Sequence, residues 1–534
     1  MSLSPFPSFA YTIPFPGAKI QAVHGAERPG ACMIAAYASH LRGERILGAG
    51  RHLTPLQIGQ VFATAASTIG IPIIRLQTWA EGINCDRFEV TPGPIGGLTP
   101  SQYQLGAVAG LTVAGGVLAM GIGLGKTLTT AVAARSYVVD QWVAPTRCWI
   151  VAPLSAMAAW TPFLPDLRRL YADVKVISID SAHKLVGADN SAGGLLVIDE
   201  AHYAGHHDAR RTRALHKIRL GFDACICLTG TLLHSGIEAA MNVLDLAIPG
   251  CVGFSTKWTA GEYFQCLERF ELSSGRRVAK VGKPVGNHRD AFLTWCQRYV
   301  VALAKDSPAV RNEITIPEQH LHTVTFGDDL DSEDAAVECL VRLVHEHYLD
   351  KGLPLPHASE LRHVALRDGV AMKMEWLLEQ MADNDLPVAV FAEYQDTLDA
   401  AELVLTEAKI SYARVDGAVT GEARAEIVRR FQAGEIRVFL GQIDATGLSI
   451  NLFRASISVA IDHTQRAANY AQMLGRTCRR GQTEECNHID LVANPVQAVC
   501  VSRLRAGEDF NAALTTLCNQ ALTKDTSCIP SSAT

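Results

Sequence analysis

Short apolar runs recur along this chain, and most are followed by a stretch with the hydrophobic spacing of a helix. The clearest runs are CWIVAP (148–153), LLVIDE (195–200), ACICLTGT (224–231), VAVFAEY (388–394), IRVFLGQ (436–442), ISVAID (457–462) and HIDLVA (488–493). Continuous runs of Val, Ile and Leu bounded by helices are typical of parallel strands that are covered on both faces. The alternation predicts an α/β fold built from doubly wound units.

The runs fall into two groups, which predict two α/β lobes at residues 96–250 and 365–505, each a parallel sheet flanked by helices. The segment between them, 251–364, is more polar, and we expect a helical inter-lobe region there. Residues 1–95 are expected to form a small mixed N-terminal accessory domain of unassigned role. Residues 506–534 are expected to be a partly disordered tail.

Composition narrows the class of protein. The chain is 48% hydrophobic and 19% charged over 534 residues, which indicates packed globular domains. No apolar run reaches the ~20 residues that span a bilayer, and the N-terminus lacks a signal-peptide pattern. The 14 cysteines form no CxxC pair, so buried, reduced thiols are favoured over a disulfide framework or a metal site. The net charge of −6 excludes a globally basic surface but not a local basic groove.

The stretch AMGIGLGKTLTT (119–130) resembles a phosphate-binding loop between a strand and a helix. Its inner glycines, Gly121, Gly123 and Gly125, would let backbone N–H groups approach phosphate. Lys126 would contact the β- and γ-phosphates, and Thr127 would hold Mg²⁺. Met120 stands where the usual pattern begins with glycine, so a Gly-rich turn with a chance lysine is the competing interpretation.

The run LLVIDEAH (195–202) places two carboxylates directly after an apolar strand, where ligands bind in α/β proteins. Asp199 suits the Mg²⁺ shell, and Glu200 suits the base that orients or deprotonates the attacking water. Two solvated acids at a strand end are the alternative. The pairing with the upstream GKT sequence favours the catalytic interpretation.

In the order of these and further motifs, the chain resembles the superfamily 2 helicases and, within them, the Swi/Snf-type DNA translocases. The matching stretches are IGLGKT, IVAPLSAMAAW (150–160), DEAH, LTGTLLHS (228–235), AVFAEY (389–394), RVDG (414–417), RAEIVRRF (424–431), DATGLSINL (444–452) and QMLGRTCRRGQ (472–482). They extend over residues 98–482, and the family also lacks the leading glycine of the loop. The resemblance implies two RecA-like P-loop lobes.

The resemblance implies further ATP-site residues. Gln104 matches the glutamine that reads adenine, with a surface polar residue as the alternative. Arg476 and Arg479 match the arginine fingers, for which a planar, permanently charged fork is suited; a basic helix face is the alternative. Leu124 and Gln472 are also expected at the nucleotide. ATP and Mg²⁺ are the implied cofactors, with ATP in a cleft between the lobes.

The family tracks one DNA strand by its phosphates, and the resemblance implies candidate contacts in several motifs. These are Pro153, Ser155, Asp416, Gly417, Thr446 and Asn451. His202 and Thr229, Gly230 and Thr231 would couple the ATP site to the nucleic-acid groove, although His202 is equally explained as a core histidine. Two basic stretches, a loop at 275–289 and a helix at 209–219, fit DNA contact or a solvated face equally well.

Several positions depart from the family pattern, and the sequence lacks the lobe-2 insertion typical of large chromatin remodellers, which favours the compact branch of annealing-helicase-like, phage or bacterial translocases. Leu232 replaces a proline, HTQRAAN (463–469) replaces the segment before the last motif, and ALAKD (302–306) is what remains of the basic inter-lobe element. We therefore expect an ATP hydrolase, stimulated by DNA, that remodels or reanneals duplex DNA. A strand-separating DNA or RNA helicase and an ATP-gated clamp are the alternatives.

We further expect a monomeric motor in the cytoplasm, or in the nucleus of a eukaryote. The pattern at 51–73 predicts a helix and then a strand.

Overall fold

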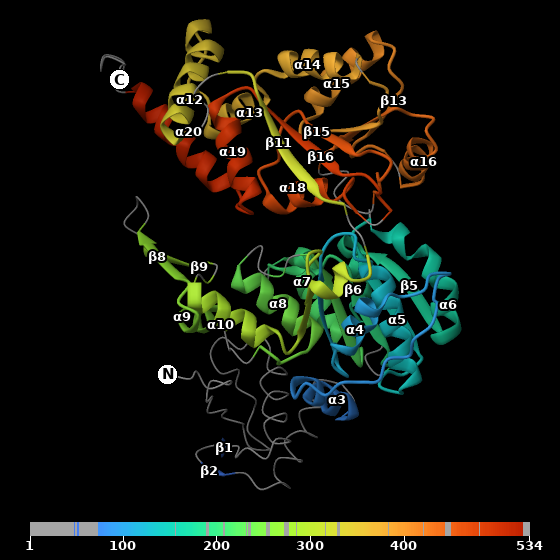
Figure 1. Ribbon diagram of the computed structural model, residues 1–534. Coiled ribbons are helices and arrows are strands. Elements are labelled where there is room, and N and C mark those ends of the chain that lie inside the picture. The colour runs from blue at the N-terminus through green and yellow to red at the C-terminus, as the bar shows by residue number, and fades with distance from the viewer. Residues whose placement is uncertain are drawn as a thin grey trace. The chain divides into compact units, whose positions relative to one another are not determined.

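A computed structural model of the chain describes most of the sequence. The described residues are 47–48, 51–52, 73–154, 156–187, 192–206, 209–230, 232, 236–252, 257–271, 277–282, 284, 286–314, 317–327, 332–382, 384–419, 421–443, 450–479 and 481–526. They divide into two compact units, Met1–Glu313 and Ile314–Thr534 (Figure 1). Most of residues 1–95, including the pattern at 51–73 except its first two residues and Ile73, lies outside the described set.

The first unit contains a six-stranded parallel sheet in the order β10-β3-β7-β6-β4-β5. Its strands are β3 Gly115–Met120, β4 Arg147–Ala152, β5 Asp173–Ser178, β6 Leu195–Ile198, β7 Ala224–Thr229 and β10 Val300–Leu303. Side chains alternate across the sheet, so Val117 and Cys225 face one core cluster while their strand neighbours face the other side. Both faces are covered, as the continuous apolar runs predict.

Helices account for the two covered faces. They are α3 Ile73–Ile83, α4 Gln102–Ala109, α5 Lys126–Val139, α6 Leu164–Leu170, α7 Arg210–Arg219, α8 Ile237–Ala247, α9 Lys257–Tyr263, α10 Gly286–Cys296 and α11 Pro308–Arg311, with 3-10 turns η1 Met157–Phe163, η2 Ile179–Leu185 and η3 Ala201–Ala204. One core cluster joins the sheet to α3, α7, α8 and α10. The antiparallel pairs β1 Leu47–Gly48 with β2 Arg51–His52, and β8 Leu267–Glu271 with β9 Arg277–Val281, are separate from this sheet.

The second unit repeats the architecture with a parallel sheet in the order β11-β16-β15-β12-β14-β13. Its strands are β11 Gln319–Thr325, β12 Val388–Ala392, β13 Tyr412–Val415, β14 Val438–Gln442, β15 Ile457–Ala460 and β16 Cys486–Val492. Its helices are α12 Glu333–His347, α13 Ala358–Arg367, α14 Val370–Ala382, α15 Gln395–Glu407, α16 Gly421–Gln432, α18 Ala467–Leu474, α19 Pro495–Arg505 and α20 Asn511–Thr526, with the turn η4 Leu349–Lys351. The predicted α/β fold class with two parallel-sheet lobes is confirmed.

Three expectations differ from the structure. The segment 251–364 is not a separate helical region, because it supplies β10 to the first sheet and β11 to the second. Residues 511–526 are not tail: α20 buries Leu514, Leu517 and Cys518 in the second core because its apolar side chains recur at helical spacing. The basic stretch 275–289 is not a loop in its described part, since β9 and the start of α10 occupy it.

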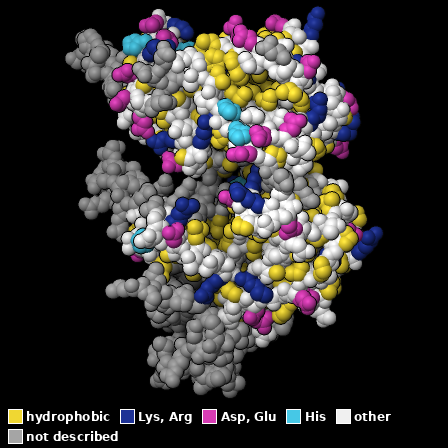
Figure 2. Space-filling model, viewed as in Figure 1, with side chains coloured by type: hydrophobic (Ala, Val, Ile, Leu, Met, Phe, Trp, Pro, Cys, Tyr) yellow, Lys and Arg dark blue, Asp and Glu magenta, His cyan; other side chains and the backbone are white. Residues whose placement is uncertain are grey.

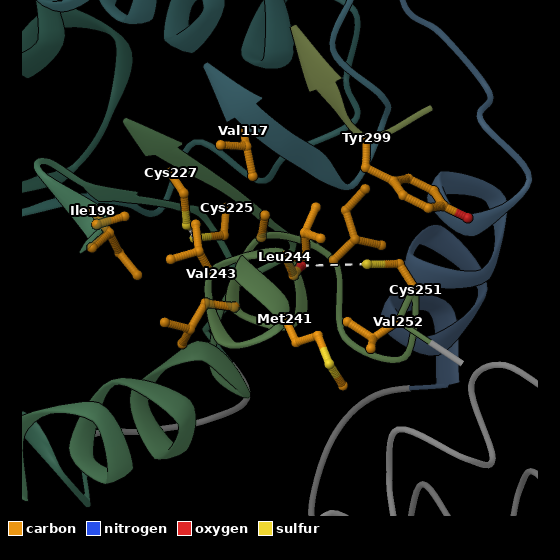
Figure 3. Close-up of a cluster of buried hydrophobic side chains, with 14 of the residues drawn as sticks. Val117, Ile198, Cys225, Cys227, Met241, Val243, Leu244, Cys251, Val252 and Tyr299 are labelled. Carbon is orange, nitrogen blue, oxygen red and sulfur yellow. Dashed lines mark hydrogen bonds between the residues drawn. The ribbon is translucent and has the colours of Figure 1, made fainter. Parts of the chain in front are cut away.

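The cysteines in the described part of the chain behave as expected. All are free thiols, and all but Cys85 are buried. Figure 3 shows Cys225, Cys227 and Cys251 among Val117, Leu244 and other apolar side chains of the first core, with the Cys251 thiol donating to the Leu244 carbonyl at 3.4 Å. Burial raises the pKa of the Cys251 and Cys227 thiols well above the ordinary value, so these sulfurs stay protonated and act as small apolar groups.

Among the described residues, no helix is both long and apolar enough to cross a bilayer.

Candidate nucleotide site

The Gly-rich loop follows β3 and leads directly into α5, as the sequence predicts. Gly123 and Gly125 have φ values of 87° and 76°, in the left-handed region that favours glycine. Gly125 is the N-cap of α5, and the N–H groups of the first helical turn have no acceptor within the helix. The loop therefore presents open donors and the positive end of a helix dipole, which together bind anions.

Met120 does not damage this loop. It is the last residue of β3, pairs with Leu303 of β10, and is buried in regular strand conformation. The left-handed positions of the loop come later, at Gly123 and Gly125, so a side chain is accommodated at position 120. The Lys126 ammonium donates to the Met120 carbonyl at 3.1 Å, an interaction that any residue at 120 would offer.

Helix α4 braces the far end of the loop. The Gln104 Nε2 donates to the carbonyls of Leu124 (3.1 Å) and Gly125 (3.4 Å), and the Tyr103 hydroxyl donates to Leu124 at 3.1 Å. The Gln104 Oε1 accepts the Ser101 N–H at 2.9 Å. Gln104 is 1% exposed, so it is not a surface polar residue, and its contact with adenine stays a prediction.

Asp199 and Glu200 follow β6 at the carboxyl edge of the sheet, the same edge as the loop. The Asp199 Oδ2 accepts the Trp160 Nε1–H at 3.0 Å, and its Oδ1 accepts the Glu200 N–H at 3.0 Å. Burial, reinforced by the charge of Glu200, raises the pKa of Asp199 to about 6, while Trp160 and the Lys126 cation oppose the shift. A buried carboxylate with a raised pKa beside a cation fits a position where a divalent ion would replace the lost water.

Glu200 has a strained backbone. Its φ of 48° is left-handed, which costs a non-glycine residue of order 1–3 kcal/mol and is found mostly at functional positions. The conformation turns the chain at the strand end, with the Glu200 side chain 15% exposed and its Oε2 3.3 Å from the His202 Nδ1. Glu200 is thus accessible to a water molecule, whereas Asp199 is enclosed.

Trp160 is a site residue that the motif analysis did not single out. It lies on η1, is 1% exposed, and holds one Asp199 oxygen through its indole N–H. The signal was present in the quoted stretch IVAPLSAMAAW, because a buried tryptophan N–H needs an acceptor. Trp160 fixes the orientation of the Asp199 carboxyl.

The expected coupling residues are only partly described. Thr229 is the buried last residue of β7 and pairs with Ala119 beside the loop. Gly230 follows it, and Thr231 lies outside the described residues. His202 is 22% exposed in its side chain and lies close to Glu200, which leaves its coupling role a prediction.

In the second unit, the structure brings Arg476 and Arg479 together after α18. The Nη1 atoms of both guanidiniums donate to the Ile450 carbonyl, at 3.3 Å and 3.0 Å, and the Arg479 Nε donates to Gly475 at 3.0 Å. Desolvation lowers the pKa of Arg479 to about 10, so it remains a cation at neutral pH. Gln472 is half-buried one turn earlier on α18.

The four nucleic-acid candidates that the structure describes, Pro153, Asp416, Gly417 and Asn451, lie outside its helices and strands. Asp416 accepts the Arg414 Nε–H and the Ala418 N–H, both at 2.9 Å, so its carboxylate shapes its own turn and only nearby backbone would approach phosphate. The Asn451 Oδ1 is buried and has no hydrogen-bond partner within the described structure. Gly417 and the buried Pro153 are described, whereas Ser155 and Thr446 lie outside the described residues.

The surface charge is mixed. On the face shown in Figure 2, Lys and Arg side chains are interspersed with Asp and Glu side chains on each unit. The basic helix predicted at 209–219 is confirmed as α7, but Arg219 is 1% exposed and donates to main-chain carbonyls such as Leu246 at 2.9 Å. This arginine is structural and is removed from the set of possible DNA contacts.

Comparisons with known proteins agree with the motif pattern. Residues 372–481 match the family model of the helicase conserved C-terminal domain. The chain is 24% identical over 404 residues to a probable chromatin-remodeling complex ATPase chain of Oryza sativa subsp. japonica, over 69% of this chain and 36% of that protein. It is also 24% identical over 473 residues to the SWI/SNF-related matrix-associated actin-dependent regulator of chromatin subfamily A member 1 of Mus musculus, over 78% of this chain and 44% of that protein.

A solved structure, the Sulfolobus solfataricus SWI2/SNF2 ATPase core in complex with dsDNA, aligns with a TM-score of 0.37 and 15% identity, over 84% of this chain and all of that chain. The chain spans less than half the length of the two curated relatives above. The matched range of the family model, residues 372–481, includes the paired arginines Arg476 and Arg479. Together, the family model and the relatives support a Swi/Snf-type, helicase-like ATPase of superfamily 2.

Proposed function

We propose that this chain is a DNA-dependent ATPase that moves along double-stranded DNA and remodels or reanneals it. The observation that carries the proposal is the assembly of Lys126, Asp199 and Glu200 at one edge of the first sheet. There the Lys126 charge influences the titration of the buried Asp199 carboxyl. An anion-binding loop, a buried carboxylate and an accessible carboxylate are the parts that phosphoryl transfer to water requires.

We assign the binding of ATP to the Gly-rich loop. The first-turn N–H groups of α5 would receive the phosphates, and Lys126 would exchange the Met120 carbonyl for the β- and γ-phosphate oxygens. Thr127 and Asp199 would hold Mg²⁺, which neutralises charge on the phosphate oxygens when bound. Trp160 would keep one oxygen of the Asp199 carboxylate fixed.

Hydrolysis is assigned to three further side chains. Glu200 would orient and deprotonate the attacking water. Arg476 and Arg479 would stabilise negative charge on the transferred phosphoryl group, and their shared contact with the Ile450 carbonyl holds their guanidiniums together. Gln104 and Gln472 are retained as candidates for contacts to the nucleotide.

The DNA part of the proposal rests on the similarity to Swi/Snf-type ATPases and on the names of relatives that act in chromatin remodelling. Tracking by phosphate contacts would use main-chain groups near Pro153, Ser155, Gly417 and Thr446, because such contacts do not depend on base sequence. Asn451 adds a buried side-chain oxygen that has no hydrogen-bond partner among the described residues.

The test is the ATPase rate of the whole chain with duplex DNA, single-stranded DNA, RNA or no nucleic acid. We expect stimulation by duplex DNA and near-complete loss of turnover in Glu200→Gln, which keeps the shape but removes the base. Asp290→Asn, an exposed acid on α10, is the matched control and should leave the rate unchanged. Equal rates with and without nucleic acid would refute the motor, and stimulation by RNA alone would reassign it as an RNA helicase.

A further inference from the structure

The segment that ends the first unit, residues 300–313, contacts the first residue of the nucleotide loop. Strand β10 pairs with β3 in parallel, and the carbonyl of its last residue, Leu303, accepts the N–H of Gly121 at 2.8 Å. Gly121 is the first loop residue after β3. A side-chain Cβ at Gly121 would lie 3.5 Å from the Lys305 Cγ, so the chain after β10 also runs against the loop.

The same segment reaches the end of the loop through α4. Two of the four first-turn donors of α4 have a local acceptor, since the N–H groups of Gln104 and Leu105 both donate to the Ser101 carbonyl. The two N–H groups before them, on Gln102 and Tyr103, donate to the two carboxylate oxygens of Glu313, each at 2.6 Å. A carboxylate at a helix N-terminus also interacts favourably with the helix dipole. Glu313 therefore completes the cap of α4.

Helix α4 connects Glu313 to the nucleotide loop, because residues at its N-terminus contact both. The residues that Glu313 caps are adjacent to, or identical with, those that hold the loop: Tyr103 and Gln104 both donate to the Leu124 carbonyl. Gly125 is packed so closely that a Cβ there would lie 2.5 Å from the Gln104 Nε2. A shift of the α4 N-terminus would thus move the residues just before Lys126.

One side of α4 faces an open pocket. The pocket, of about 380 Å³, lies between α4, β10 and the turn around α11, and its lining includes Gln102, Gly106, Val301 and Glu313. On this side the polar contacts at the N-terminus of α4 add to the packing of its buried residues, Tyr103 and Gln104. Glu313 supplies two of these polar contacts while remaining exposed to solvent itself.

We propose that Glu313 is a positioning residue for the nucleotide loop, and that residues 300–313 tie the geometry of that loop to the chain that continues as the second unit. Glu313 is the last residue of the first unit, and Ile314 begins the second. The segment is short and holds the loop at both ends, so a pull on the connecting chain acts on the loop through Leu303 and through Glu313 with α4. The proposal rests on the proposed function, since it concerns the same ATP site.

The experiment compares Glu313→Ala and Glu313→Gln with the whole wild-type chain. The readouts are KM for ATP and kcat at saturating duplex DNA, together with direct binding of a fluorescent ATP analogue without DNA. We expect Glu313→Ala to raise KM and weaken analogue binding about fivefold, equivalent to about 1 kcal/mol, with kcat within about twofold of wild type. Glu313→Gln keeps one acceptor oxygen, so its KM and its affinity for the analogue should lie between those of wild type and Glu313→Ala. Asp290→Ala is the matched control.

A double variant tests the route of the effect. If Glu313 acts through α4, Glu313→Ala combined with Gln104→Ala should weaken binding no more than Gln104→Ala alone. Unchanged KM in Glu313→Ala, a loss confined to kcat, or additive effects would each overturn the positioning role. A wild-type chain that neither binds the analogue nor hydrolyses ATP would instead refute the proposed function, which separates the two failures.

Discussion

At the residue scale, the Asp199 carboxyl carries two opposing demands. It is 6% exposed and lies between Trp160 and the Glu200 main chain, which keeps it fixed but removes most of its water. Its proton is therefore held more tightly than that of an ordinary carboxyl, with a pKa of about 6. A protonated Asp199 is a poor ligand for a divalent cation, because metal ligands must be deprotonated.

ATPase activity should accordingly decrease at acidic pH. We predict that kcat/KM for Mg²⁺ and ATP is low below pH 6 and rises as pH increases through about 6, where Asp199 loses its proton. In Trp160→Phe the N–H that stabilises the charged form is absent, so the pKa of Asp199 should rise and the acid limb should move to higher pH. The pH profile of kcat/KM for both proteins is the measurement.

The control for this prediction is Trp258→Phe, which changes a tryptophan that is 41% exposed on α9. It should leave the profile unchanged. An acid limb that stays in place in Trp160→Phe would show that Asp199 does not set the pH dependence.

At the element scale, the sequence predicts the buried central strands better than it predicts the strands at the sheet edges. The apolar runs that become β4, β6, β7, β12, β14, β15 and β16 are fully or largely buried, so hydrophobicity alone marks them. β10 and β11 are half-exposed and lie at sheet edges. In β11, polar residues such as His320 and His322 alternate with apolar ones and weaken the hydrophobic signal, whereas β10 is apolar but only four residues long. Edge strands need only one covered face, so the sequence pattern of 251–364 does not mark these two strands.

Helix α18, which leads to Arg476 and Arg479, is anchored by a buried acid on β16. The Asp490 Oδ2 accepts the Tyr470 hydroxyl of α18 at 2.6 Å and the Arg505 Nη2 of α19 at 2.7 Å. Its Oδ1 lies 3.2 Å from the ring nitrogens of His463 and His488. These partners, led by His488, hold the pKa of Asp490 well below 3.8 despite its burial.

We predict that Asp490→Asn destabilises the second unit by about 3 kcal/mol, because it leaves buried partners of a charge without their counterpart. Hydrogen exchange should accelerate in α18 and α19 before other helices. Since the folded-state pKa of Asp490 is depressed, its stabilisation is fully present above pH 3.8, the ordinary value of the carboxyl. The stabilisation is lost as pH falls further, through the lower pKa that Asp490 has in the folded state. The exposed Asp350→Asn should change neither stability nor exchange, and equal exchange in both variants would contradict the anchoring role.

At the scale of the whole molecule, the sequence indicates candidate site residues more readily than domain boundaries. The loop, the acid pair and the paired arginines are short local motifs whose residue types the chemistry dictates, so the sequence alone proposes them. Trp160 and Glu313 escaped because their roles depend on contacts with Asp199 and α4 that only the folded chain creates. The boundary at residue 95 depends in the same way on what the preceding segment touches.

Helix α3 shows why that boundary matters. Its Trp79 is fully buried and donates to the Asp223 carbonyl at 2.8 Å, and its Arg75 Nε donates to the Asp223 carboxylate at 3.0 Å. The same carboxylate accepts the Gly194 N–H at 2.8 Å, just before β6 and the acid pair. Residues 73–83 therefore belong to the core of the first unit rather than to an accessory domain.

Two truncations should separate these roles. We predict that removing residues 1–95 destabilises the first unit by about 3–5 kcal/mol, the usual cost of losing a buried tryptophan, and abolishes ATPase activity through loss of fold. Removing residues 1–72 keeps Arg75 and Trp79, so the melting temperature of the first unit and the ATP-binding affinity should be preserved. Trp79→Ala in the whole chain should reproduce the destabilisation. If the two truncated proteins have the same melting temperature, α3 is not part of this core. If only the protein that lacks residues 1–72 folds, its ATPase rates on forked and linear DNA, compared with those of the whole chain, measure what residues 1–72 contribute to substrate choice.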